Sequence, residues 1–123
     1  MSSEQFAKAR RAAETRGRSS ETLAAWLLRL KLYRILGRRV RTHAGEIDLV
    51  ARSPRGVLCF VEVKARRDDR AALESVAPRQ RARIERAASL FVAGKPNLAR
   101  HGLLFEIVTV APFPRHIQHA RLP

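Results

Sequence analysis

The residues best suited to metal binding or catalysis lie between positions 46 and 64 of the 123-residue chain. Residues 57–64 form an apolar run whose period-two alternation places Glu62 and Lys64 on the same face. That face is apolar at its start and charged at its end, as expected where a strand leaves a core and enters a cleft. Asp48 lies in the preceding run, 46–52, and a hairpin of the two runs would bring it beside Glu62.

Converging carboxylates favour a bound cation, because without one they repel each other and the pKa of one of them rises. Mg²⁺, or Mn²⁺, prefers oxygen ligands and keeps water molecules that can be activated. Asp48 and Glu62 are therefore predicted metal ligands, and the carbonyl oxygen of Val63 could supply another. Lys64 could position or deprotonate an attacking water, or stabilise charge on a phosphate. This chemistry suits phosphodiester cleavage.

A plain surface ion pair is the alternative interpretation of Glu62 and Lys64, since such a pair contributes only about 0 to 1 kcal/mol. The bare E-x-K tripeptide by itself favours that interpretation. Composition weighs slightly against it, because only four of the 25 basic residues are lysines. A lysine at this position is mildly informative.

A hairpin must position these side chains. Residues 53–56, with the sequence SPRG, are a strong turn signal, so the strands 46–52 and 57–64 are predicted to pair antiparallel. Further strands are predicted over 33–41, over 103–110 as a buried strand, and over 117–120 as a short edge strand.

Two helices are predicted around these strands. Ser19 or Ser20 can cap the first, with Glu21 in its first turn. Its core-facing side is predicted from the helical spacing of four large apolar residues: Leu23, Trp26, Leu27 and Leu30. The second is amphipathic and basic, and runs from Pro78 to Gly94.

Domain organisation follows from length and composition. Residues 1–18 are rich in alanine and basic residues and are expected to form a basic arm or helix. Residues 19–123 are expected to form a single domain. The lone Cys59 cannot form an internal disulfide, and no N-terminal apolar segment reaches signal-peptide or membrane-span length, so we expect a cytoplasmic protein.

The net charge of +14 selects an anionic partner. Nucleic acid is the leading candidate, although a ribosome or an anionic membrane surface would also suit this charge. Charge alone specifies no reaction. His116 and His119 have a loose metal-ligand spacing, but without Cys or acidic neighbours in the sequence they are expected to lie on the surface.

Three segments together resemble a known family: GEIDLV at 45–50, FVEVKAR at 60–66 and PRQ at 78–80. They look like the YraN family, bacterial proteins similar to archaeal Holliday junction resolvases, and the resemblance runs from about Gly17 to Val110. It implies an α/β restriction-endonuclease-like fold of the PD-(D/E)xK type, a central mixed β-sheet flanked by α-helices.

The resemblance also implies site roles. It makes Asp48 and Glu62 metal ligands and Lys64 the catalytic lysine, and it matches Glu21 to a helix-borne glutamate that completes the site in resolvases. Gln80 matches a position near that site, although an exposed helix residue is an equal alternative. The chain departs from the family at Leu32, where a glycine is usual, and at Glu106, where an aspartate is usual.

The function expected from these observations is a Mg²⁺-dependent endonuclease acting on branched or structured DNA. The resolvases it resembles are dimers, so a homodimer is also an expectation. The alternatives are a non-catalytic nucleic-acid-binding protein and a ribosome-associated or RNA-binding adaptor. The residues expected to contact nucleic acid are basic and lie in three segments: Arg38, Arg39, Arg41 and His43; Arg66 and Arg67; and Arg79, Arg83 and Arg86.

Overall fold

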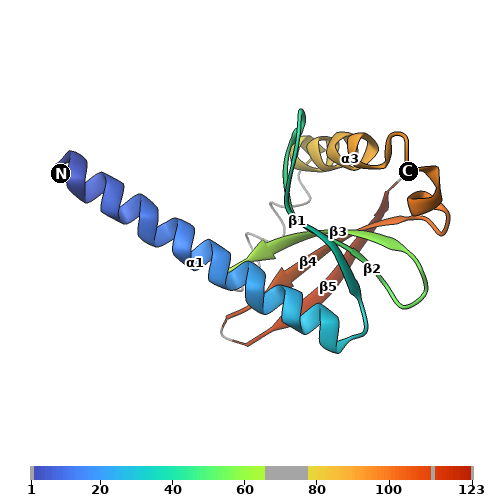
Figure 1. Ribbon diagram of the computed structural model, residues 1–123, viewed down its shortest axis with the longest axis horizontal. Coiled ribbons are helices and arrows are strands. Elements are labelled where there is room, and N and C mark those ends of the chain that lie inside the picture. Colours follow the sequence, from blue (N-terminus) through green and yellow to red (C-terminus); the bar gives the residue numbers. More distant parts are fainter. Residues whose placement is uncertain (1, 66–77, 112, 123) are drawn as a thin grey trace.

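A five-stranded mixed sheet forms the centre of the computed structural model (Figure 1). The structure describes residues 2–65, 78–111 and 113–122, without the side chains of 9–18, 80 and 118–122. The strands lie in chain order: β1 (Arg34–Thr42), β2 (Gly45–Arg52), β3 (Leu58–Lys64), β4 (Leu103–Thr109) and β5 (Arg115–Leu122). Among the strands that the structure describes, only β3 and β4 pair in parallel. The predicted β2–β3 hairpin is confirmed, and β5 is longer than expected.

Two long helices cover opposite faces of this sheet. The alternation along β3 decides which side chains each helix meets: Phe60 packs in a core cluster with α3 (Pro78–Val92), and Val61 packs in another with α1 (Ser3–Leu30). A short 3₁₀ helix, η1 (Pro96–Ala99), leads into β4. The α/β class with a mixed sheet flanked by helices is therefore confirmed.

Helix α1 begins much earlier than the sequence predicted. It is 28 residues long and starts at a capping box in which Ser2 and Gln5 satisfy each other's backbone N–H groups. The predicted start at Ser19 or Ser20 is wrong, because the alanine-rich basic segment continues the helix. Figure 1 shows the N-terminal half of α1 extending beyond the sheet. The division into an arm and a domain stays a prediction.

The buried face of α1 also differs from the predicted one. Leu23, Trp26 and Leu30 are 56%, 57% and 79% exposed, and of the predicted apolar stripe only Leu27 packs against the core. The sheet instead contacts the face that carries Ala24, Ala25 and Leu28, all fully buried. Small alanines let the helix approach the strands closely.

The turn after α1 gives a physical reason for the glycine that the family resemblance expects at position 32. Leu32 has φ 68°, in the left-handed region that a side chain disfavours, and it is 79% exposed.

Among the described residues, no helix is long and apolar enough to span a membrane.

Candidate acidic metal site

The site forms where β2 and β3 separate. Backbone pairing between them runs from Arg52 with Leu58 to Leu49 with Val61. Beyond that pair, the Asp48 carboxylate accepts a hydrogen bond from the backbone N–H of Val63 at 2.8 Å. The Asp48 side chain thus replaces a backbone carbonyl as the acceptor for Val63, and this bond fixes the Asp48 carboxylate at the mouth of the hairpin, the open end where β2 and β3 separate.

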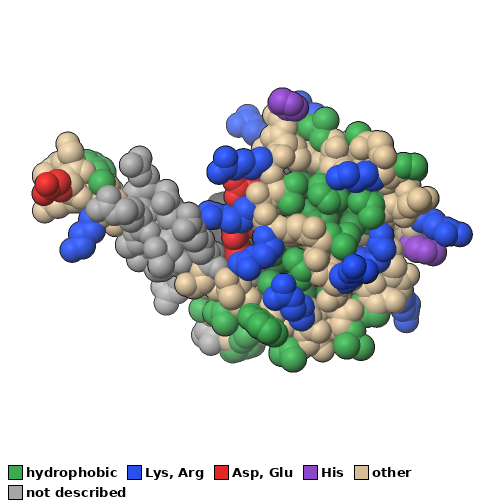
Figure 2. Space-filling model, in the orientation of Figure 1, with side chains coloured by type: hydrophobic (Ala, Val, Ile, Leu, Met, Phe, Trp, Pro, Cys, Tyr) green, Lys and Arg blue, Asp and Glu red, His purple; other side chains and the backbone are tan. Residues whose placement is uncertain are grey.

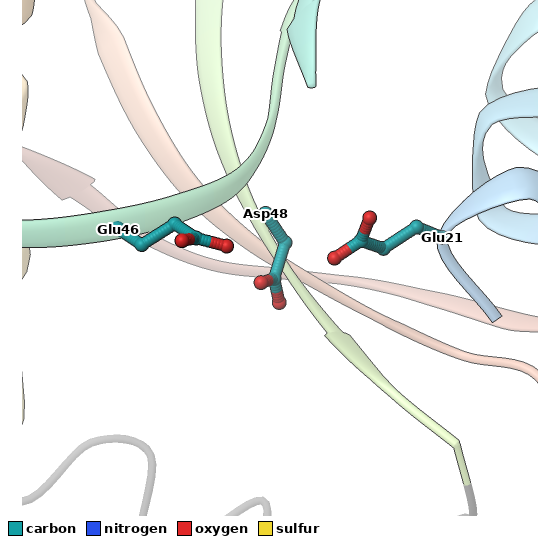
Figure 3. Close-up of side chains that lie close together, drawn as sticks. All are labelled: Glu21, Glu46 and Asp48. Carbon is teal, nitrogen blue, oxygen red and sulfur yellow. The ribbon is translucent and has the colours of Figure 1, made fainter. Parts of the chain in front are cut away.

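Three carboxylates converge at this mouth (Figure 3). Glu46 and Asp48 come from β2 and Glu21 comes from α1, and one oxygen from each lies within 4.8 Å of the others. Glu21 points here because it shares the buried helix face of Ala24, Ala25 and Leu28. The face that the sequence predicted to be buried would have turned Glu21 toward solvent.

The donor set matches a hard divalent cation. All three groups offer carboxylate oxygens, the ligands that Mg²⁺ and Mn²⁺ prefer. With Mg²⁺–oxygen bonds of about 2.0–2.1 Å, ligand oxygens lie roughly 3–4 Å apart, so the observed spacing needs only a small contraction. Glu46, which is 42% exposed, can move to close it.

Asp48 shows the electrostatic strain expected of such a site. Desolvation by burial, followed by repulsion from Glu62 and then from Glu21, raises its pKa to about 6, although the hydrogen bond from Val63 lowers it. Asp48 is therefore repelled both by Glu62 of β3 and by Glu21 of α1. A bound divalent cation would relieve this repulsion.

Glu62 and Lys64 lie next to this cluster, on the face of β3 that turns toward α3. One Glu62 oxygen lies 3.5 Å from Lys64 Nζ and the other lies 3.8 Å from an Arg83 nitrogen. Glu62 is thus outside the three-carboxylate group, and its role as a metal ligand stays a prediction. Lys64 is one-third exposed and has its ammonium at the edge of the site.

Arg83 reaches the site because position 45 is a glycine. Its guanidinium donates to the carbonyl oxygen of Glu46 at 3.2 Å, and a Cβ at Gly45 would lie 2.8 Å from an Arg83 nitrogen. Gly45 also has φ 133°, which a side chain rarely adopts. Arg83 thus connects α3 to β2 and β3 beside the carboxylates, and its expected contact with nucleic acid stays a prediction.

Arginines of β1 neutralise the other two glutamates. Arg39 Nε lies 3.4 Å from a Glu21 oxygen and 3.9 Å from a Glu46 oxygen. Arg41 lies 3.8 Å from the second Glu46 oxygen and is 89% exposed.

Glu46 is the site residue that sequence reasoning missed. Its only sequence signal was that Glu46 and Asp48 share a strand face, and that signal did not distinguish a ligand from a solvated residue. Predicted residues Arg66 and Arg67 lie outside the described residues, as does the side chain of Gln80, which is in the first turn of α3. The Val63 backbone is at the site, where its N–H holds Asp48.

Three other basic residues expected to bind nucleic acid line one groove. His43, Arg79 and Arg86 border a hollow of about 840 Å³ between the β1–β2 turn and α3. Arg38 is bound to the Thr22 hydroxyl at 2.8 Å. Figure 2 shows acidic side chains gathered in a narrow strip with Lys and Arg side chains beside it.

A second buried polar cluster corrects the expectation for His116. The His116 side chain is 4% exposed and bonds the fully buried Glu106 of β4, which also accepts a hydrogen bond from Tyr33 at 3.2 Å. Burial and the nearby Glu106 raise the pKa of the Cys59 thiol. Sequence spacing gave no warning of this cluster, because Tyr33 and Glu106 are 73 residues apart.

Comparison with known proteins identifies the family. A model described as uncharacterised protein family UPF0102 matches residues 20–110, most of the chain. The chain belongs to the UPF0102 family. This is the YraN family, so the resemblance is confirmed.

UPF0102 relatives match along nearly the whole chain. A UPF0102 protein of Maricaulis maris is 52% identical over 120 residues, covering 94% of this chain and 92% of the relative. Another, from Paramagnetospirillum magneticum, is 49% identical over 127 residues and covers 98% and 97%. The matched UPF0102 region includes all the acidic residues of the site and Lys64.

Proposed function

We propose that this protein is a metal-dependent endonuclease that hydrolyses phosphodiester bonds in branched or structured DNA. The observation that carries the proposal is the convergence of Glu21, Glu46 and Asp48 within 4.8 Å, beside Glu62 and Lys64, in a protein of net charge +14. A protein that only binds a polyanion has no chemical need for clustered carboxylates, because they repel phosphates.

The fold supports this assignment to the PD-(D/E)xK type. A mixed sheet carries Asp48 on one strand of a hairpin and Glu62 and Lys64 on the next, with Glu21 supplied by the preceding helix. Fold similarity alone does not establish a reaction. The convergence of the carboxylates is the observation that supports a metal-dependent reaction.

The residues have distinct roles in the proposed hydrolysis. Glu21, Glu46 and Asp48 would hold Mg²⁺ or Mn²⁺, with Glu62 next to them. The ion, when bound, supplies positive charge to the phosphate and lowers the pKa of a coordinated water. Lys64 donates from its ammonium to a phosphate oxygen as negative charge develops there. Water adds to phosphorus, the bond to one bridging oxygen breaks, and that oxygen leaves with a proton.

The basic surface supports a nucleic-acid substrate. Arg79, Arg86 and His43, which line the groove, would neutralise phosphates on the α3 side of the site. We propose a cytoplasmic setting, and a homodimer as the form that would engage two arms of a branched DNA.

Cleavage of a DNA panel tests this function. Labelled single-stranded, duplex, flap and four-way-junction DNAs are incubated with Mg²⁺, Mn²⁺ or EDTA. We expect cleavage of at least one branched substrate with metal, none with EDTA, and none by Asp48→Asn. Binding without cleavage of any substrate under either metal would contradict the proposal and favour the non-catalytic binding protein.

A further inference from the structure

Arg39 occupies the position of a cation between two of the three converging carboxylates. Its Nε lies 3.4 Å from Glu21 and 3.9 Å from Glu46. The Glu21 side chain is only 9% exposed, whereas the Arg39 side chain is 41% exposed. One guanidinium thus offsets charge on the two glutamates while the third carboxylate, Asp48, keeps a raised pKa.

The backbone directs Arg39 to this place. Its neighbours pair with β2 as Arg38 with Leu49 and Val40 with Ile47, so Arg39 lies opposite Asp48 in the middle of β1. Its φ is 51°, in the left-handed region, where among the described non-glycine residues only Leu32 joins it. Arg39 therefore departs from regular strand geometry directly across from the site.

We propose that Arg39 is the resident counter-ion of the acidic site, which a divalent cation must displace before the site is active. The inference rests on the proposed function, because it assumes that the three carboxylates bind the ion. A divalent ion held by Glu21 and Glu46 would repel a guanidinium that contacts the same oxygens. The guanidinium must then leave those oxygens.

The displaced guanidinium has a new partner at the same edge of the sheet. A phosphate brought to the metal presents oxygens that a planar guanidinium binds through paired N–H groups. Metal and DNA would therefore assist each other's binding, since the ion releases Arg39 and the phosphate accepts it. Such coupling is reciprocal for the two affinities.

Metal titration of variants tests this role. Mn²⁺ affinity is measured by calorimetry on the full chain without DNA, for wild type, Arg39→Met and Arg41→Met. We expect Arg39→Met to bind Mn²⁺ about ten-fold more tightly, within the usual range of coupling between sites. Arg41→Met removes the same charge from an 89% exposed residue that touches only Glu46 in this cluster, so its affinity should stay within about two-fold of wild type.

A second variant protects the test against misfolding. Arg39→Gly also removes the guanidinium, and glycine accepts a φ of 51° without strain, so it should bind Mn²⁺ as tightly as Arg39→Met. Equal affinity in wild type and both Arg39 variants, or equal tightening in Arg41→Met, would overturn this inference and leave the proposed function standing. Absence of Mn²⁺ binding in every protein would overturn the proposed function itself.

Discussion

At the scale of single residues, the four carboxylates of the site differ in the partner that each one contacts. Glu62 contacts Lys64 and Arg83, and the two glutamates of the three-carboxylate cluster contact Arg39. Asp48 instead accepts one backbone hydrogen bond and has a raised pKa. Asp48 is therefore the residue whose ionisation most directly reports whether a cation is present.

Asp48→Asn should stabilise the metal-free protein at neutral pH. The folded-state pKa of about 6 lies above the ordinary 3.8, so the folded protein binds more protons than the unfolded chain between these values, and stability falls as pH rises through this window. Two pKa units correspond to at most about 3 kcal/mol, and partial solvation reduces this to about 1–2 kcal/mol. Chemical denaturation with EDTA should show this gain at pH 7.5 and almost none at pH 4. An equal difference at both pH values would contradict this origin.

Mg²⁺ should reverse that order of stability. Binding to the folded state alone adds RT ln(1 + [L]/Kd), about 2.7 kcal/mol at an ion concentration of 100 times Kd. The melting temperature of wild type should therefore rise with Mg²⁺ at pH 7.5, whereas that of Asp48→Asn should change little. The metal does not bind at Asp48 if both proteins respond alike.

At the scale of elements, the orientation of α1 decides whether the site exists. The sequence correctly predicted the β2–β3 hairpin and α3, because turn signals and short-range periodicity are local. It failed on α1, because Leu23, Trp26 and Leu30 carry the stronger local apolar signal but packing favours the alanine face. Periodicity alone would have turned Glu21 toward solvent, and only the family resemblance matched it to the site, where it lies beside Glu46 and Asp48.

A pair of leucine substitutions tests this orientation. Leu28→Ala should destabilise the protein by about 3 kcal/mol, because a fully buried leucine loses its contacts and leaves a cavity. Leu23→Ala, at a 56% exposed position of the same helix, should change stability by about 0.5 kcal/mol or less. Urea denaturation measures both, and a larger effect at Leu23 would mean that the opposite face is buried.

At the scale of the whole molecule, the basic net charge favours an anionic partner, and the cluster of three carboxylates favours a bound cation. The net charge of +14 could be read from composition, and the D and E-x-K positions from motif spacing. The contributions of Glu46, Arg39 and Arg83 could not be read from the sequence. They depend on where the strands separate and on Gly45, whose missing side chain leaves room for Arg83.

The groove beside α3 should set the salt dependence of DNA binding. Replacing Arg79 and Arg86 with alanine should lower the slope of log K against log salt by about 2, since each lost phosphate contact removes about 0.9. The matched control is Arg55→Ala with Arg100→Ala, exposed residues away from this groove. Equal changes in both double variants would mean that the groove is not the principal contact surface.

The most direct test of the proposed site is single-turnover cleavage of a branched DNA by wild type, Lys64→Ala and Lys95→Ala, with Mg²⁺ and at saturating DNA. Lys64 is the lysine at the acidic site, whereas Lys95 is exposed and lies over the Phe91 ring. We predict that Lys64→Ala lowers the cleavage rate by about 100-fold or more while binding DNA almost as tightly, and that Lys95→Ala cleaves like wild type. Cleavage by Lys64→Ala at the wild-type rate would contradict the proposed site.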